Sequence, residues 1–477
     1  MTPTSEPTLG RSSAVMVVGT LASRVTGFLR TIVLAAAVGI ALVGDAYNVA
    51  NTLPNILYDL LLGGVLTSVV VPLLVAAAAA DDDGGEAYAQ RLVTLVVLVL
   101  GAASALAVLA APLVIRLYAV SADPAQRALA TTFARFLLPQ IVFYGLGATI
   151  GAILNTRGRY AEPMWTPVLN NLVVIATALV FLALPGRRHL SPSSITSAQT
   201  LTLAIGTTLG IVVQTVALLP GLRATGFRLR LRLDLRGTGL RSAGRLAGWV
   251  LCYVLVNQVG LLVIVNLANA AARASGSGFS AYIYAYSLFQ LPYAVVSVSV
   301  ITALLPRMSR SAVEGRLDEV RSDLSSGLRL TGVVLIPAAL GFVVLGPALA
   351  TLVFAHGQVS QAGAEQIGAV LAAFAVGLVP FSAFQLQLRA FYAMRDTRTP
   401  ALVNIVVTAV NIAADIALYL ALPPRDRVTG LALGFAASYV AGLALSSLVL
   451  RRRLGGLDGA RVLRTTVRLL VAAAAGA

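Results

Sequence analysis

The chain has 477 residues, of which 58% are hydrophobic and only 11% charged, and its mean hydropathy is +0.87. A water-soluble protein of this size needs a larger charged surface, so the composition predicts an all-α polytopic membrane protein. The net charge of +16 comes from arginines in short loops, not from a patch beside aromatic residues, and we expect no nucleic-acid partner. The single cysteine, Cys252, excludes an intrachain disulfide and any metal site made of several cysteines.

Apolar runs between polar residues predict twelve membrane spans. The first run is unlike a removable signal peptide, because Arg24 interrupts it and no small-residue cleavage site follows. A last run begins near 465 and is too short to cross roughly 30 Å of hydrocarbon, so either the chain is truncated there or that end is not a span. The twelve spans are expected near residues 14–43, 46–79, 92–115, 130–155, 164–184, 200–221, 246–271, 280–305, 328–354, 365–394, 401–421 and 428–450.

Loop arginines alternate sharply between the two sides of the membrane, with 23 on the side of the N-terminus and seven on the other. The positive-inside rule therefore places the N-terminus in the cytoplasm. We expect a cytoplasmic tail (1–13), an N-lobe of six helices (14–222), a basic cytoplasmic linker (223–245), a C-lobe of six helices (246–450) and a basic cytoplasmic loop with the start of a thirteenth helix (451–477).

The two halves of the chain resemble each other at a nearly constant offset. Pro54 of TLPNILYDLLLGG matches Pro292 of QLPYAVVSVSV, and Pro139 matches Pro380. An offset of six spans keeps the direction through the membrane, so the pattern predicts two pseudo-symmetric lobes around a central cavity, as in transporters. Proline inside a span frees backbone groups, which is tolerated beside a watery cavity. The second and eighth predicted spans, which contain Pro54 and Pro292, are therefore either cavity-lining helices or helices kinked only for packing.

Arg24 and Arg30 stand inside the first predicted span, in the stretch SRVTGFLR. An arginine at a helix centre costs roughly 2.5–3.5 kcal/mol on insertion scales, so both side chains need compensation. One explanation is a salt bridge to Asp45, Asp59 or Asp415. The other is a cavity for an anionic group, because a guanidinium suits bidentate contact with phosphate. The two positions point about 120° apart around the helix, which allows them to line one broad cavity.

Asn411 and Asp415 are four residues apart in NIVVTAVNIAADIALYL and share one helix face. The pair is either a candidate metal site for a coupling ion such as sodium, or a buried hydrogen-bonded pair. The two histidines, His189 and His356, lie far apart in sequence, and no glycine-rich phosphate loop follows a strand. We therefore expect a transporter and not an enzyme, without a cofactor beyond a coupling sodium ion, driven by an ion gradient or the membrane potential.

Three stretches in this order and spacing resemble the MurJ/MviN lipid II flippases of the multidrug/oligosaccharidyl-lipid/polysaccharide exporter superfamily, as an actinobacterial-type member. They are SRVTGFLR, GDAYNVANTLPN and GAILNTRGRYAEPMWTPVLNN, with FYAMRDTRTP as a weaker match. The resemblance spans essentially the whole chain. It implies fourteen helices in two lobes around a cationic cavity that receives the pyrophosphate of an undecaprenyl-linked peptidoglycan precursor. The family's last two helices, which line a lipid groove, are mostly absent here.

Residue by residue, the resemblance makes Arg24 and Arg30 cavity arginines and Asp45 the acidic residue at the start of the second helix. Asn411 and Asp415 resemble part of a sodium site described for some members. This chain departs from the family where relatives carry further charges. Tyr58 and Asp59 follow LPN in place of arginines, and Ser287 and Gln290 replace an arginine and a glutamate, so the cavity should be less cationic. The predicted substrate-binding residues are Arg24, Arg30, Asp45, Asn55, Ser287 and Gln290.

The leading hypothesis is a flippase in the bacterial cell membrane that moves lipid II from the inner to the outer leaflet by alternating access. Arg24 and Arg30 would contact the pyrophosphate. A flippase for another lipid-linked oligosaccharide and an ion-coupled drug exporter of the same superfamily are the alternatives. A third hypothesis is a membrane scaffold without transport activity. The expected partners are lipid II, membrane lipids and proteins of cell-wall synthesis or division.

Overall fold

The structure is a computed structural model that describes residues 9–63, 71–80, 83–185, 190–234 and 244–476. Within these ranges every regular element is a helix, which confirms the all-α prediction. Ten helices are long and apolar enough to cross a membrane, and a pair bent by 49° makes an eleventh candidate. The remaining predicted span, 46–79, contains residues 64–70, which lie outside the described ranges.

The chain divides into two compact units, each described here by itself. Unit 1 comprises Met1–Val38, Ala46–Leu117 and Asp123–Gly248. Unit 2 comprises Gly39–Asp45, Tyr118–Ala122 and Trp249–Ala477. The two short segments of unit 2 interrupt the sequence of unit 1, so the division does not follow a single cut in the chain. The domain boundaries expected from the sequence stay predictions.

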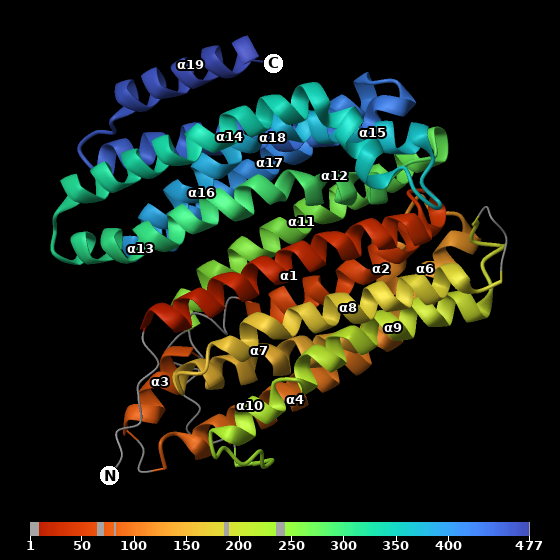
Figure 1. Cartoon of the computed structure of the whole chain (residues 1–477), viewed down its shortest axis with the longest axis horizontal. Helices are drawn as coiled ribbons and strands as arrows, with labels where there is room; N and C mark the ends of the chain where they lie inside the picture. Colours follow the sequence, from red (N-terminus) through yellow and green to blue (C-terminus); the bar gives the residue numbers. More distant parts are fainter. Residues whose placement is uncertain (1–8, 64–70, 81–82, 186–189, 235–243, 477) are drawn as a thin grey trace. The chain divides into compact units, whose positions relative to one another are not determined.

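Unit 1 is a bundle in which α1 packs along α8, α8 along α9, and α4 along α7 (Figure 1). A buried cluster around Leu92, Ile153, Leu154 and Leu222 forms part of its core. Its helices are α1 (Leu9–Val38), α2 (Leu42–Tyr58), η1 (Asp59–Gly63), α3 (Val71–Ala80), α4 (Glu86–Leu109), α5 (Ala111–Tyr118), α6 (Pro124–Leu137), α7 (Gln140–Thr156), α8 (Ala161–Ala183), α9 (Ser197–Val216) and α10 (Leu219–Ala224).

Unit 2 pairs α14 with α15 and α17 with α18, and α19 lies along α14 (Figure 1). Part of its core is a cluster around Met308, Phe384, Phe391 and Leu450. Its helices are α11 (Gly244–Ser275), α12 (Phe279–Pro292), η3 (Tyr293–Ser297), α13 (Val298–Val313), α14 (Leu317–Phe354), α15 (Gln361–Val376), α16 (Leu378–Ala393), α17 (Arg398–Ala421), η4 (Pro424–Asp426), α18 (Arg427–Arg453) and α19 (Gly459–Gly476).

The spans that contain Pro54 and Pro292 have the same local departure from a regular α-helix. Pro54 is followed by the π-helical turn η1, and Pro292 is followed directly by the π-helical turn η3. Because proline lacks an N–H and its ring crowds the preceding turn, the backbone widens locally. Matching turns in the two units agree with the repeat that the proline spacing indicates.

Helix ends differ from the sequence-based boundaries where turn chemistry decides them. α1 begins at Leu9, inside the predicted 1–13 tail. α18 ends at Arg453, just before Gly455 and Gly456 adopt positive φ. After this turn α19 begins at Gly459, six residues before the predicted run. At 1.5 Å per residue its 18 residues extend about 27 Å.

Candidate functional site

Arg24 and Arg30 both lie on α1, and neither forms an ion pair within the described ranges. The Arg24 side chain is exposed and the Arg30 side chain is half-buried. The Nε of Arg30 is fully buried and finds no hydrogen-bond partner in the described part of the chain. Leaving a buried charged donor unmatched is costly, so this guanidinium is poised to receive an acceptor.

Tyrosine hydroxyls surround Arg30 in unit 1. Its charge interacts electrostatically with Tyr47 and with Tyr144, and the Tyr144 hydroxyl donates to Gln140 Oε1 at 3.4 Å. The rings of Tyr58 and Tyr144 lie 5.9 Å apart between centroids. The surroundings of Arg30 thus include neutral tyrosine hydroxyls, whereas Asn55 Nδ2 donates to the Asn51 carbonyl oxygen on its own helix.

Asn171 on α8 holds the SRVTGFLR stretch in place. Its Nδ2 donates to the Ser23 carbonyl oxygen and to Thr26 Oγ1, both at 3.0 Å. A Cβ at Gly27 would lie 3.4 Å from the same nitrogen, an ordinary van der Waals distance, so α1 and α8 are in contact here. The backbone between the two arginines is thus fixed against a neighbouring helix.

Asp45 lies in unit 2 and is fully buried. One carboxylate oxygen accepts a hydrogen bond of 2.7 Å from the backbone N–H of Ser280, in the first turn of α12. A carboxylate there satisfies a free N–H and favours the positive end of the helix dipole. A Cβ at Gly278 would come within 2.3 Å of the second oxygen. Asp45 thus caps α12, and its assignment to substrate binding stays a prediction.

The side chains of Ser287 and Gln290 on α12 form hydrogen bonds with neighbours on the same helix. Ser287 Oγ donates to the Tyr284 carbonyl oxygen at 2.7 Å, and Gln290 Nε2 donates to the Tyr286 hydroxyl. The rings beside them form a continuous aromatic cluster, which comprises Tyr286, Phe289, Phe374, Phe381, Phe435 and Tyr439. The structure thus groups these two residues with aromatic side chains.

Asn411 and Asp415 form the pair that their spacing predicts. Asn411 Nδ2 donates to Asp415 Oδ2 at 3.0 Å, and both residues are buried. Asp415 Oδ1 has no partner in the described part of the chain, and a Cβ at Gly434 would lie 2.0 Å from it. The described residues hold no cluster of three or more His, Cys, Asp or Glu fit for a metal. An orphaned, buried carboxylate oxygen nevertheless fits a small hard cation.

Arg389 on α16 was missed in the sequence because only loop arginines and those of the first span were considered. Its Nε is buried without a partner among the described residues, as in Arg30. The guanidinium lies 5.8 Å from the centre of the Tyr392 ring and interacts electrostatically with Tyr253 on α11. The signal available was a charge inside the apolar run 365–394. Unit 2 thus has its own guanidinium beside tyrosine hydroxyls.

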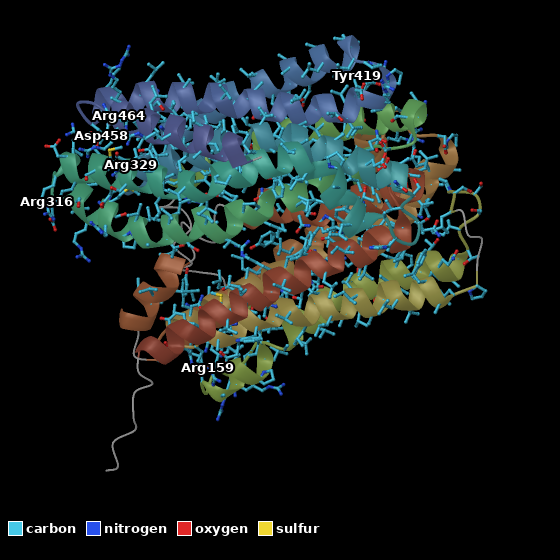
Figure 2. The ribbon with its side chains drawn as sticks, turned by 45° about the horizontal axis from the view of Figure 1, so that its top comes forward. Arg159, Arg316, Arg329, Tyr419, Asp458 and Arg464 are labelled. Carbon is cyan, nitrogen blue, oxygen red and sulfur yellow. The ribbon has the colours of Figure 1, made fainter. Side chains whose placement is uncertain are left out.

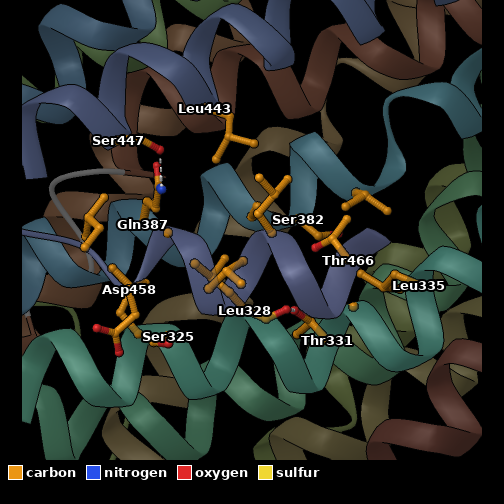
Figure 3. A pocket seen from close by; sticks show the side chains of 18 of the residues that line it. Ser325, Leu328, Thr331, Leu335, Ser382, Gln387, Leu443, Ser447, Asp458 and Thr466 are labelled. Carbon is orange, nitrogen blue, oxygen red and sulfur yellow. Dashed lines mark hydrogen bonds between the residues drawn. The ribbon is translucent and has the colours of Figure 1, made fainter. Parts of the chain in front are cut away.

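A cavity of about 280 Å³ lies among α14, α16, α18 and α19 (Figure 3). Its walls are mainly apolar, with Leu328, Leu335 and Leu443 among them. Ser325 and Ser382 line it with buried hydroxyls that have no partner in the ranges described. Such a cavity suits an apolar chain that carries few polar groups.

The long apolar helices, with Nε atoms of Arg30 and Arg389 inside them that find no partner among the described residues, define a polytopic helical membrane protein that carries cationic groups within its spans. A family described as "Lipid II flippase MurJ" matches residues 34–477. The chain therefore belongs to the lipid II flippase MurJ family, whose members are transporters in the membrane and not enzymes, as predicted.

Individual relatives agree with this membership. A "Lipid II flippase MurJ" of Burkholderia cenocepacia is 30% identical over 438 residues, which cover 90% of this chain and 81% of that protein. A "Probable lipid II flippase MurJ" of Rhizobium meliloti is 28% identical over 462 residues, which cover 95% of this chain and 83% of that protein.

Solved structures show the same fold. One titled "Lipid II flippase MurJ, inward closed conformation" has a TM-score of 0.78 at 20% identity and covers 96% of this chain and 91% of its own. An inward-facing multidrug transporter of the MATE family has a TM-score of 0.71 at 15% identity, and the match covers 92% of this chain and 94% of that transporter. The fold is thus shared by lipid flippases and drug exporters, so the likeness by itself does not distinguish their substrates.

Proposed function

We propose that this protein moves lipid II from the inner to the outer leaflet by alternating access, with Arg24 and Arg30 contacting the pyrophosphate. The observation that carries the proposal is the buried Nε of Arg30, which has no acceptor among the described residues although the side chain sits inside an apolar helix. A phosphate oxygen would supply that acceptor. Each charge-assisted hydrogen bond contributes about 1.5–3 kcal/mol, enough to offset much of the insertion cost of an arginine.

We include Arg389 in the same proposal as the cation of unit 2. The sequence has neutral Ser287 and Gln290 where relatives carry a charged pair, so α12 contributes no guanidinium. Arg389 repeats the features of Arg30, a buried unmatched Nε beside tyrosines. Arg389 is thus a further candidate cation for an anionic head group, within unit 2.

For the driving force, we propose that sodium binds at Asp415 Oδ1, with Asn411 positioning the carboxylate. The unmatched buried oxygen supports this assignment. Sodium bound at this site would neutralise the negative charge of the Asp415 carboxylate. Replacing Asp415 by Asn keeps the shape and removes the charge, so transport by the variant should lose its dependence on sodium. Equal transport by wild type and variant across sodium concentrations would contradict the assignment.

For the lipid tail, we propose the apolar cavity among α14, α16, α18 and α19. Its leucine-rich walls and small number of hydroxyls suit an isoprenoid chain. Leu328→Trp would fill the cavity from α14, and we expect weaker binding of lipid II with unchanged binding of soluble pyrophosphate. Unchanged lipid II binding by the folded variant would exclude this location.

For the orientation, we propose a cytoplasmic N-terminus. In unit 2, Arg316, Arg329 and Arg464 lie at one end and Tyr419 lies at the other (Figure 2). This separation fits the alternation of loop arginines along the sequence. A cysteine introduced near the N-terminus of a Cys252→Ala variant should resist a membrane-impermeant maleimide in intact cells, and labelling there would reverse the assignment.

Native mass spectrometry of the purified protein tests the proposed substrate. We expect lipid II to be retained in preference to cardiolipin, and Arg24→Ala, Arg30→Ala and Arg389→Ala each to reduce its retention. Cells that depend on this protein should not grow on Arg24→Ala or Arg24→Glu at normal protein levels. Growth on both variants would refute pyrophosphate binding by Arg24, and equal retention of lipid II and cardiolipin would refute the substrate.

A further inference from the structure

Residues 227–234, with the sequence FRLRLRLD, form an irregular segment beside the start of α4 in unit 1. Arginine and leucine alternate from Arg228 to Leu233. The side chains of Leu229, Leu231 and Leu233 are 49%, 69% and 77% exposed, and the three arginines are exposed as well. Exposed apolar and cationic side chains in one short segment are typical of a surface that meets both hydrocarbon and phosphate.

The segment is held by one polar stripe of α4, in which Glu86, Gln90 and Thr94 follow each other at intervals of four residues. The Arg228 backbone N–H donates to Glu86 Oε1 at 3.1 Å, and Gln90 Nε2 donates to the Arg228 carbonyl oxygen at 2.6 Å. The Arg232 N–H donates to Thr94 Oγ1 at 2.9 Å.

These anchors are compatible with a nearly extended backbone. Eight residues of α4 rise about 12 Å, and four residues of chain reach at most about 14 Å when fully extended. Because successive side chains of an extended chain point to opposite faces, the leucines stand on one face of the segment and the arginines on the other.

Both ends of the segment are also fixed. Phe227 is buried in the core of unit 1, and the Arg157 guanidinium lies 5.2 Å from the centre of its ring. At the other end Arg91 pairs with Asp234 at 3.0 Å. Within the described ranges no ion pair involves Arg228, Arg230 or Arg232, although Arg232 interacts electrostatically with the exposed Asp83.

The face of α4 that carries the segment faces lipid farther along the helix. Steps of three or four residues from Thr94 lead to Leu98, Leu106 and Leu109, which are 47%, 66% and 78% exposed. This helix is apolar enough to cross the membrane, so these leucines contact hydrocarbon. The segment covers the first two turns of the same face and therefore lies where hydrocarbon gives way to lipid head groups.

We infer that residues 228–233 form a binding site for anionic phospholipid head groups, in which the leucines insert at the edge of the hydrocarbon and the arginines contact lipid phosphates. The site belongs to the surface of unit 1 and does not depend on which substrate the protein transports. A protein strand that pairs with the free edge of the segment is the competing occupant.

Native mass spectrometry with equal amounts of phosphatidylglycerol and phosphatidylcholine tests the charge of the site. Each basic residue near an anionic surface strengthens association about fivefold, so R228Q/R230Q/R232Q should lower phosphatidylglycerol retention by at least tenfold and leave phosphatidylcholine unchanged. The control R116Q/R273Q/R425Q removes the same charge from exposed positions near the ends of α5 and α11 and in η4, and it should have little effect. Equal losses in both variants would mean a response to net charge and would overturn the site.

Fluorescence quenching in phosphatidylglycerol nanodiscs tests the depth of the leucines. In a Cys252→Ala background, a probe on Leu231→Cys should be quenched by lipids labelled near the head group, with a fluorescence loss at least twice that caused by aqueous iodide. Leu106→Cys provides the lipid-facing reference and Ser193→Cys the water-facing reference. A Leu231 probe that behaves like the Ser193 probe would refute insertion. Protection from both quenchers would indicate a protein strand instead and would likewise refute it.

Discussion

Replacing Asn171 by leucine should loosen the α1 stretch that carries the two arginines. Leucine keeps the branched outline and the number of heavy atoms of the side chain, and it removes the two hydrogen bonds to Ser23 and Thr26. Neither acceptor is left without a partner, because the Ser23 carbonyl also lies in the α1 ladder and Thr26 Oγ1 bonds to the Ala22 carbonyl at 2.7 Å. The cost is therefore the net value of two interhelical bonds at about 0.6 kcal/mol each, or about 1.2 kcal/mol.

Unfolding of the solubilised protein by denaturing detergent measures this free energy, and a cycle with Thr26→Val isolates one of the two bonds. We expect Asn171→Leu to lower the free energy of unfolding by about 1–2 kcal/mol, with a coupling of about 0.6 kcal/mol to Thr26→Val. Lipid II binding should weaken about two- to fivefold, because the backbone between Arg24 and Arg30 is less restrained. Wild-type stability of Asn171→Leu, together with strict additivity in the cycle, would refute the reasoning.

Further predictions concern packing and pH. A Cβ at Gly368 would lie 2.3 Å from the backbone of α14, which cannot move aside, so Gly368→Ala should lower the free energy of unfolding by about 3 kcal/mol. Gly341→Ala, where nothing lies within 4 Å, should leave it unchanged or slightly higher, and equal effects of the two would contradict the packing argument. Although partial burial opposes it, hydrogen bonds from Thr399 and the charge of Arg453 hold the pKa of Asp396 below its ordinary value. The carboxylate therefore stabilises the protein above about pH 4 and loses this effect at lower pH. Asp396→Asn should reduce the loss of unfolding free energy at acid pH by less than 1 kcal/mol. An unchanged loss in the variant would exclude a contribution of the Asp396 carboxylate to stability.

Hydropathy and proline spacing predicted the helices well because a membrane allows few alternatives. A segment of twenty apolar residues in a bilayer must satisfy its own backbone, so its sequence nearly determines that it is a helix. The end of α18 was harder to place, because a glycine pair with positive φ sets it and local hydropathy does not report φ. The residue spacing of Asn411 and Asp415 predicted their contact, since residues four apart meet on any helix.

Contacts between distant parts of the chain could not be read in this way. The family resemblance predicts Asp45 as a substrate-binding residue, and that assignment stays a prediction. Its carboxylate accepts a hydrogen bond from the first turn of α12, 235 residues away. Nothing local to Asp45 records the free N–H of Ser280. Arg389 was overlooked for the converse reason, because a charge in a span shows its importance only once its Nε is known to be buried and unmatched.

The sequence by itself determined that this protein is helical, crosses the membrane many times and carries two arginines within its first span. Those properties depend on composition and periodicity, which act over a few turns of helix. Only the tertiary structure decided which guanidiniums lack an acceptor, which carboxylate is used as a helix cap and where an alternating Arg–Leu segment meets a lipid-facing helix. These depend on side chains brought together from distant positions, and the free energy of a buried polar group is set by the partners that packing provides.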